Sequence, residues 1–306
     1  MPIEIFGSDY QYLPRKEILD FEEIERLVRV FAAQGGKKLR ITGGEPLLRR
    51  DLTKLIQQLS KVAGIEDIAM TTNASLLAKF AGDLKAAGLQ RVTVSLDSLE
   101  PAVFAKMNGV GAKPSRVVEG IDAALAAGLG VKINSVVQKG TNEEGLSDLV
   151  EFARERRVPI RFIEYMDTGN TNGWKLDHVV PSAEILSQLQ KKFDLQAVEN
   201  PSLGETAVRY AEPRVPGFEV GFISSVTKPF CRDCNRLRLS ADGHLYTCLF
   251  ASNGYDIKSP MRDGESDDEL AQRFSSLWGA RKDRYSELRS EGKGDGPKKE
   301  MSYLGG

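Results

Sequence analysis

The three cysteines of the chain lie within eighteen positions near its carboxyl end. Two residues separate Cys231 from Cys234, and thirteen separate Cys234 from Cys248. Soft thiolates at this spacing suit an iron–sulfur cluster or zinc, and a zinc site would recruit His244 as its fourth ligand. A four-iron cluster held by three thiolates would keep one iron open for a substrate atom. The alternative is three reduced, partly buried cysteines that bind no metal.

Two arginines follow the first pair of cysteines. Arg236 and Arg238 are two positions apart, so in a strand they would project from the same face. Paired guanidinium groups suit a phosphate or a carboxylate. Exposed arginine pairs are equally common on protein surfaces, and it is the neighbouring cysteines that favour an anion site.

Short apolar runs and amphipathic segments alternate over the first 166 residues. Asp20, followed three positions later by Glu23, is a candidate capping box for the first helix. Five strands alternating with helices predict parallel β-α-β units, in a sheet that helices cover. We predict strands over 38–42, 65–72, 91–96, 131–137 and 160–166, and helices over 21–33, 51–62, 74–87, 115–127 and 143–156.

Polar residues stand at the end of each predicted strand. Reactive groups gather at the carboxyl ends of parallel strands both in barrels and in open doubly wound sheets, which spacing alone does not distinguish. These ends therefore predict the rim of a pocket, although ordinary loops would give a similar list. They carry Thr42-Gly43-Gly44-Glu45, Thr71-Thr72-Asn73, Ser95-Leu96-Asp97, Asn134-Ser135 and Glu164-Tyr165-Met166.

The regular alternation stops after Met166, and the chain divides into two regions, residues 1–175 and 176–306. A turn-rich stretch begins the change, and a helix, short β-like segments and a further helix follow it. We predict these elements at 169–173, 182–193, 218–224, 236–240 and around Leu270.

The composition is that of a globular chain. Hydrophobic residues make up 41% and charged residues 28% of the 306 residues, which excludes a disordered or fibrous protein. The balance of 42 Lys and Arg against 43 Asp and Glu argues against binding nucleic acid by bulk charge. No apolar run approaches the roughly 18 residues of a membrane span. Three cysteines exclude a multi-disulfide secreted scaffold, so we expect a cytoplasmic protein.

Several segments together resemble the radical S-adenosylmethionine enzymes of molybdenum cofactor biosynthesis, and most closely the GTP 3′,8-cyclase (MoaA-type) family. The resemblance covers essentially the whole chain. It implies an α/β fold, an incomplete (β/α)6 TIM-like barrel with a C-terminal α+β extension. The segments are Arg40-Ile-Thr-Gly-Gly-Glu-Pro-Leu-Leu-Arg-Arg-Asp-Leu, Thr71-Thr-Asn, Ser95-Leu-Asp, Arg161-Phe-Ile-Glu-Tyr-Met-Asp and the cysteine set.

The resemblance also implies a lyase that rearranges GTP into (8S)-3′,8-cyclo-7,8-dihydroguanosine 5′-triphosphate. A radical from S-adenosylmethionine would abstract a ribose hydrogen, and no residue is assigned as catalytic. The matching positions are Arg40, Thr71, Lys132, Arg236 and Arg238 for GTP, Gly44, Ser95 and Met166 for S-adenosylmethionine, and Cys231, Cys234 and Cys248 for the substrate-side [4Fe-4S] cluster. Glu45 matches a residue that stabilises the loop or the cofactor's ammonium, and Gly305-Gly306 matches a flexible end that reaches the active site.

The chain departs from the family pattern at its start. The family's barrel begins with a strand and a Cys-x3-Cys-x2-Cys loop for a second, cofactor-side [4Fe-4S] cluster, and two clusters need six cysteines. Met1-Pro2 looks like the dipeptide that follows the last of those cysteines. We therefore expect a member that lacks the first strand, binds one cluster and does not generate the radical, whether through a misplaced start or a real truncation.

The implied partners are GTP, S-adenosylmethionine, an electron donor such as a flavodoxin or ferredoxin, and the downstream cyclic pyranopterin synthase step. A homodimer is left open, and neither nucleic acid nor a membrane is expected. Two alternatives remain. One is a non-catalytic metal-binding and nucleotide-binding module of the same fold, with zinc or one iron–sulfur cluster. The other is a related radical enzyme that acts on a different substrate.

Overall fold

The computed structural model describes residues 13–170, 172–199, 204–289 and 298–304. Its main sheet has eight strands in the order β1-β2-β3-β4-β5-β8-β7-β6. The first six of this order are parallel, which confirms the predicted parallel units. The expectations for Met1-Pro2 and for Gly305-Gly306 lie outside the described residues. The parallel strands are β1 (Lys38–Ile41), β2 (Asp67–Thr72), β3 (Arg91–Ser95), β4 (Gly130–Val137), β5 (Ile160–Glu164) and β8 (Glu219–Ile223).

The sheet continues past residue 175, where the sequence pattern divides the chain. Strand β8 pairs in parallel with β5 through Ile160 and Val220, so a segment of the second region completes the parallel set. Strands β7 (Val208–Ala211) and β6 (Gln196–Val198) then extend the same sheet in antiparallel fashion. The main sheet therefore draws on both predicted regions.

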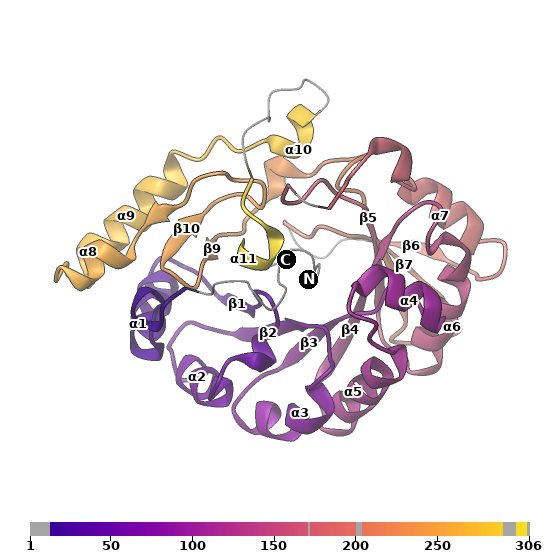
Figure 1. Cartoon of the computed structure of the whole chain (residues 1–306), viewed down its shortest axis with the longest axis horizontal. Helices are drawn as coiled ribbons and strands as arrows, with labels where there is room; N and C mark the ends of the chain where they lie inside the picture. Colours follow the sequence, from indigo (N-terminus) through magenta and orange to yellow (C-terminus); the bar gives the residue numbers. More distant parts are fainter. Residues whose placement is uncertain (1–12, 171, 200–203, 290–297, 305–306) are drawn as a thin grey trace.

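Helices follow the parallel strands and lie along the outside of the curved sheet (Figure 1). The first helix begins with the predicted capping box, because the Asp20 carboxylate accepts a hydrogen bond from the Glu23 amide and the Glu23 carboxylate accepts one from the Asp20 amide. Helix α4 (Pro101–Asn108) was not predicted, since it is short and Phe104 is its one buried residue. The other outer helices are α1 (Phe21–Ala33), α2 (Leu52–Leu59), α3 (Leu77–Ala86), α5 (Pro114–Ala126), α6 (Leu146–Glu155) and α7 (Ser182–Leu189).

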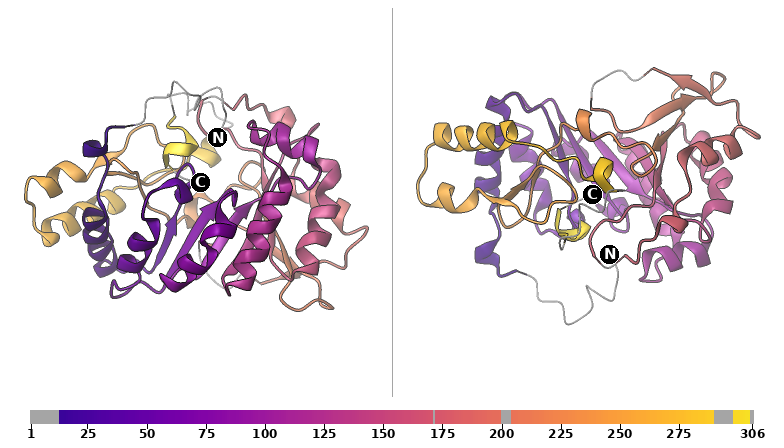
Figure 2. Two further views of the ribbon diagram at one scale, coloured as in Figure 1. Left: turned by 60° about the horizontal axis from the view of Figure 1, so that its bottom comes forward. Right: turned by 90° about the horizontal axis from the view of Figure 1, so that it is seen from above.

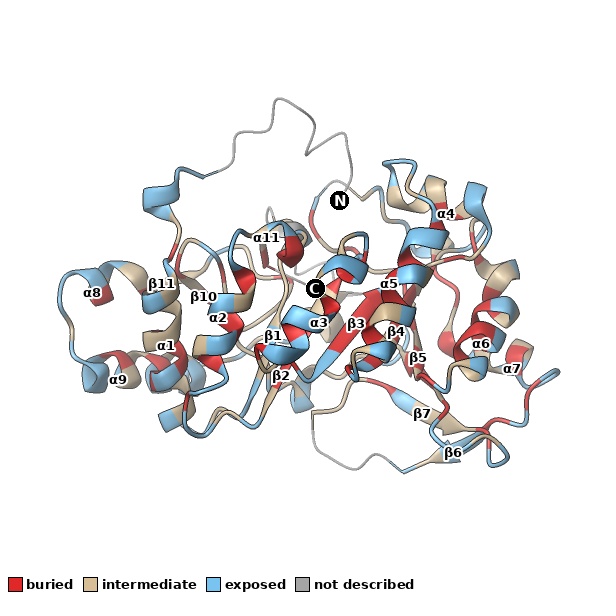
Figure 3. Ribbon diagram, turned by 90° about the horizontal axis from the view of Figure 1, so that it is seen from below, coloured by how far each residue is buried: buried red, intermediate tan, exposed pale blue. Residues whose placement is uncertain are grey.

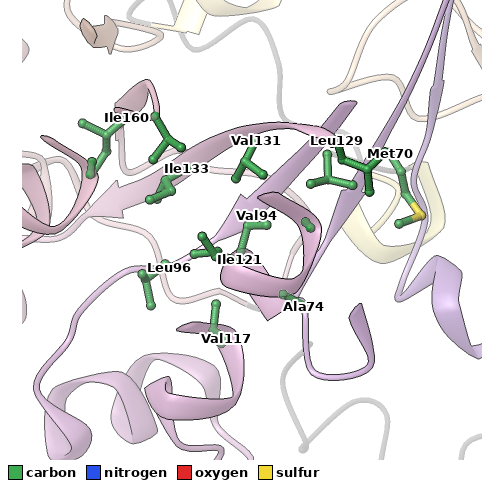
Figure 4. Packing of buried hydrophobic residues seen from close by; sticks show 14 of the residues in the cluster. Met70, Ala74, Val94, Leu96, Val117, Ile121, Leu129, Val131, Ile133 and Ile160 are labelled. Carbon is green, nitrogen blue, oxygen red and sulfur yellow. The ribbon is translucent and has the colours of Figure 1, made fainter. Parts of the chain in front are cut away.

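The main core lies between the sheet and these helices. Val94 and Ile133 point from their strands toward Val117 and Ile121 of α5 (Figure 4), and all four side chains are buried. Figure 3 shows the same division, with buried residues along β3 and β4 and exposed residues on the outer sides of the helices. Because side chains alternate along a strand, the intervening residues occupy the opposite, inner face of the sheet.

The C-terminal elements form the α+β extension that the resemblance implies. A small sheet of β9 (Arg238–Leu239), β10 (His244–Tyr246) and β11 (Tyr255–Asp256) precedes α8 (Lys258–Arg262) and α9 (Asp267–Gly279). Leu270 and Phe274 of α9 pack with Leu27 and Val30 of α1 in a second core. Helices α10 (Tyr285–Leu288) and α11 (Met301–Leu304) follow, and α11 lies inside the ring of strands (Figures 1 and 2). No helix among the described residues is long and apolar enough to span a bilayer.

Candidate functional site at the carboxyl ends of the parallel strands

Glu45 joins the ends of the first two parallel strands. Its carboxylate accepts hydrogen bonds from the Thr72 hydroxyl at 2.7 Å, the Asn73 amide at 2.8 Å and the Leu47 amide at 3.1 Å. Of the two roles expected for Glu45, the structure shows the stabilisation of the loop. The neighbouring Gly44 is exposed in this loop, directly after β1.

The other two residues expected at S-adenosylmethionine lie at the same end of the sheet. Ser95 is the last residue of β3, and Met166 stands two positions beyond β5. Between them, the Asp97 carboxylate accepts a hydrogen bond of 2.8 Å from the Val136 amide. Burial raises the pKa of Asp97 to about 6, against the effect of this hydrogen bond. The strand ends predicted to form a pocket rim therefore lie along one edge of the sheet, with the Asp97 carboxyl group among them, and the pocket itself stays a prediction.

Cationic side chains gather on the inner face of the sheet. Arg40 donates to the hydroxyls of Thr71 at 3.2 Å and Thr93 at 3.1 Å, so it reaches across two neighbouring strands. Lys132 is in register with Thr93. Arg161 is in register with Asn134 of β4. Asn134 stands two residues after Lys132, so the two side chains point to the same face of the sheet.

The cations also act on one another's pKa values. Burial, followed by the charges of Arg161, Arg91 and Arg40, lowers the pKa of Lys132 to about 8. Surrounding protein likewise desolvates Arg40 and lowers its pKa, with further contributions from Arg91 and Arg161. Like charges that depress one another in this way form a site that an anion would stabilise.

Carboxylates neutralise only part of this cluster. Arg91 pairs with Asp67, and Arg161 donates to Glu205 at 3.2 Å. Within the described ranges, no carboxylate forms an ion pair with Arg40 or Lys132, or with the two arginines near the cysteines, Arg236 and Arg238. We call these four residues and Arg161 the cationic group.

The two arginines near the cysteines do not share a strand, which corrects the prediction. Strand β9 begins only at Arg238, because its pairing with β10 starts at Tyr246. Arg236 precedes the strand, with its guanidinium 5.4 Å from the ring centroid of Phe230. Its Nε is buried and has no hydrogen-bond partner in the part of the chain that the structure describes. The two still approach closely, since burial and then the charge of Arg236 lower the pKa of Arg238.

The three cysteines are half-buried and form no disulfide. Burial raises the pKa of Cys248, and the charges of Arg238 and Cys231 also act on it. At Cys234, burial acts to raise the pKa of the thiol, but Arg236 and Arg281 lower that pKa overall. As a donor set, neighbouring thiols beside cations fit an iron–sulfur cluster.

Their side chains do not converge on one point. Across the part of the chain that the structure describes, no three His, Cys, Asp or Glu side chains are arranged to hold a metal ion. His244, the expected fourth zinc ligand, instead places Nδ1 3.2 Å from the Asp242 carboxylate. The metal site at these three cysteines therefore stays a prediction, and a bound cluster would require their side chains to turn toward one another.

Two buried carboxylates lie at this edge of the sheet, of which the sequence pattern placed Glu164 at a strand end without its partners and missed Asp167. Glu164 accepts hydrogen bonds from residues after β5 and after β8, and Asp167 accepts them from the C-terminal segment. Both lie in the segment quoted for the resemblance, but their partners are distant in sequence. Arg161 was also missed, although its alternation with buried Phe162 marks it as an inner-face residue.

Comparisons with known proteins agree with this geometry. The family model of the Radical SAM superfamily matches residues 6–153, and that of Molybdenum Cofactor Synthesis C matches residues 158–287. A GTP 3′,8-cyclase from Staphylococcus carnosus (strain TM300) is 46% identical over 310 residues, which cover 100% of this chain and 91% of the relative. A GTP 3′,8-cyclase from Staphylococcus saprophyticus matches with the same identity and coverage.

A solved structure shows the same fold at lower similarity. Streptococcus suis SuiB bound to S-adenosylmethionine superposes with a TM-score of 0.55 and 18% identity, over 81% of this chain and 57% of SuiB. At this identity the likeness supports the fold alone, a TIM-like α/β sheet with additional C-terminal elements.

Proposed function

Because this chain belongs to the GTP 3′,8-cyclase family of radical S-adenosylmethionine enzymes, we propose that its inner face is a GTP site. The reaction would be the conversion of GTP into (8S)-3′,8-cyclo-7,8-dihydroguanosine 5′-triphosphate in molybdenum cofactor biosynthesis. The observation that carries this proposal is the cationic group, four members of which have no carboxylate partner among the described residues. A triphosphate carries roughly four negative charges, which these side chains would neutralise.

The cationic group would hold the nucleotide from two sides. Arg40 and Lys132 extend from β1 and β4, whereas Arg236 and Arg238 come from the C-terminal extension. Thr71 already accepts a hydrogen bond from Arg40, so it would orient that guanidinium. Lys132 is mostly protonated at pH 7 with a pKa of about 8, and a bound anion would raise that pKa further.

We assign S-adenosylmethionine to the strand ends that carry Gly44, Ser95 and Met166. Glycine lets a ligand approach the backbone closely, and the three positions lie along one edge of the sheet. When bound, this cofactor would supply the radical that abstracts a hydrogen from the ribose of GTP. The protein's own contribution is to place cofactor and nucleotide at the same end of the strands.

We also propose that Cys231, Cys234 and Cys248 hold one [4Fe-4S] cluster beside the arginines. The remaining coordination site of such a cluster would bind the purine. Three cysteines suffice for one cluster of this kind. The complete reaction would take place in the cytoplasm with an electron donor, such as a flavodoxin or ferredoxin, and feed the cyclic pyranopterin synthase step.

Anaerobic reconstitution of the full chain with iron and sulfide tests both parts. We expect about four irons per chain and binding of GTP in preference to ATP in equilibrium dialysis. Arg238→Met should weaken GTP binding at least about tenfold, whereas Arg156→Met, which removes an arginine paired with Asp122 on the outer surface, should leave it unchanged.

Each negative outcome has a separate meaning. An iron-free protein that still binds GTP would remove the cluster and leave the nucleotide site. One zinc per chain would favour the non-catalytic module. Equal binding of GTP by Arg238→Met and the unaltered chain would remove the nucleotide proposal.

A further inference from the structure

One carboxylate approaches the cationic group from outside the parallel strands. Glu205 Oε1 lies 3.2 Å from Arg161 Nη2, and Glu205 Oε2 lies 3.6 Å from Arg209 Nε. The side chains of Arg161, Glu205 and Arg209 are 16%, 18% and 15% exposed. Glu205 thus contacts two largely buried arginines, one of which, Arg209, also donates from Nη1 to the Glu219 carboxylate at 3.2 Å.

The strand topology brings Glu205 to the functional end of the sheet. Strand β7 starts at Val208, which pairs with Phe222 near the carboxyl end of β8, so the residues just before β7 lie at that end. Gly204 packs against the Asn235 side chain so closely that a Cβ there would lie 2.5 Å from its Nδ2. Asn235 directly follows Cys234, so Glu205 stands between the inner strands and the cysteine-bearing segment.

The pairing of Glu205 is incomplete. Glu205 Oε2 and Arg209 Nε are both buried, and neither has a hydrogen-bond partner among the described residues, because 3.6 Å is too long for such a bond. The single hydrogen bond of Arg161 goes to Glu205 from Nη2, and its other N–H groups have no acceptor within the described segments. By contrast, Glu212 binds Arg154 through two hydrogen bonds of 2.6 and 3.0 Å.

A loosely held carboxylate in this position has two opposite effects. Together with Glu219, which pairs with Arg209, it offsets the mutual repulsion of Arg161, Arg209 and Lys132 while no anion is bound, and its charge acts directly on Lys132. A phosphate group that approaches Arg161 meets repulsion from the same carboxylate and competes with it for the guanidinium.

We propose that Glu205 is the resident counter-ion of the nucleotide site, a positioning residue that holds Arg161 while the site is empty and yields it to a substrate phosphate. This inference rests on the proposed GTP site. A small anion that contacts Arg161 alone gains little by replacing Glu205. A triphosphate that also contacts Arg40 and Lys132 gains enough to displace it, and the device therefore favours polyphosphate substrates over single phosphates.

Titration calorimetry of the full chain with inorganic tripolyphosphate tests the inference. Glu205→Gln should lower the melting temperature of the free protein and bind tripolyphosphate about tenfold more tightly. The matched variant Glu212→Gln, which disturbs the well-formed pair with Arg154, should lower the melting temperature and leave binding unchanged. A merely structural Glu205 would behave like Glu212, and tripolyphosphate binding by Glu205→Gln that is unchanged or weaker overturns the inference.

The unaltered chain provides a second measurement that does not depend on a variant. Hydrogen exchange of residues 204–211 should accelerate when tripolyphosphate binds, because Glu205 loses its hold on Arg161, and unchanged or slower exchange contradicts the inference. The control Arg40→Met separates the two proposals. If the unaltered chain binds tripolyphosphate and Arg40→Met binds it more weakly, the GTP site stands whatever Glu205 does. If the unaltered chain binds neither GTP nor tripolyphosphate, both proposals fall.

Discussion

The carboxylate of Asp167 accepts a hydrogen bond of 2.8 Å from the Lys298 ammonium, across 131 positions of the sequence. The same carboxylate accepts bonds from the Tyr285 hydroxyl at 2.6 Å and from Arg289 Nε at 2.9 Å. Because Asp167 follows Met166 directly, it ties the C-terminal segment to the strand end where we place S-adenosylmethionine. Asn170 adds to the tie, since its side chain exchanges hydrogen bonds with the backbone of Lys298.

Asp167→Asn should release the C-terminal segment and destabilise the protein by about 3 kcal/mol, because it leaves two largely buried cations without a carboxylate. Urea unfolding measures the loss, and limited proteolysis near residue 298 measures the release. Lys298→Met should expose the same cleavage site with a smaller loss of stability, since Arg289 stays paired. Protease resistance equal to that of the unaltered chain in both variants would refute the tie.

The pH dependence of this tie follows from the pKa of Asp167. Burial acts to raise that pKa, but Lys298, Tyr285 and Arg289 lower it overall below its ordinary value of 3.8. The stabilisation is therefore complete above the unfolded pKa near 3.8 and is lost as the pH falls through the lower folded value. Proteolysis of the segment by an acid-active protease should remain slow at pH 5 and accelerate below pH 4. Acceleration already between pH 5 and 6 would contradict this assignment.

Glu164 connects three parts of the chain through one buried carboxylate. It accepts hydrogen bonds from the amide and hydroxyl of Ser182, from the amide of Val226, and from the amide and hydroxyl of Thr227. Glu164→Gln replaces one acceptor oxygen by a donor that faces other donors, and should cost about 2–3 kcal/mol of unfolding free energy. Chemical denaturation of this variant against Glu155→Gln, an exposed glutamate, checks the value. Equal stability would show that the network rearranges without loss.

Local patterns predicted the six parallel strands of the sheet but not β6 and β7, and they did not predict the long-range pairings. The Asp20–Glu23 capping box and the ends of β2, β3 and β4 follow from periodicity and from residues a few positions apart. The start of β9 depends on its pairing with β10 across a turn. Arg236 therefore lies outside the strand that its spacing from Arg238 predicted.

The same limit applies to the charged contacts of the site. Arg161 meets Glu205 across 44 positions, and Asp167 meets Arg289 across 122. No periodicity in either segment signals these partners. The resemblance supplied Lys132, which on its own pattern is a solvated side chain, and the structure supplies the neighbouring cations that lower its pKa.

Lys132 should make polyphosphate binding depend on pH. With a pKa of about 8, it is protonated and attractive to an anion at pH 7, and it becomes neutral as the pH rises. Tripolyphosphate affinity should therefore fall between pH 7 and pH 9. Lys132→Arg keeps its charge over this range. The tripolyphosphate itself titrates equally in both experiments, so a difference between the pH profiles of the unaltered protein and of Lys132→Arg is due to Lys132. Parallel profiles for the lysine and arginine proteins would show that Lys132 does not contact the anion.

Metal content distinguishes the two possible ligand sets at the cysteines. If Cys231, Cys234 and Cys248 hold an iron–sulfur cluster, His244→Ala leaves the iron content and the visible absorbance of the reconstituted protein unchanged, because His244 faces Asp242. Cys248→Ala should abolish both signals, since two thiolates do not retain a four-iron cluster. A zinc site with three cysteines and His244 gives the opposite result for His244→Ala, which would then lose its metal. Retention of full iron content by Cys248→Ala would refute the three-cysteine set, and with it the cluster that we place beside the nucleotide.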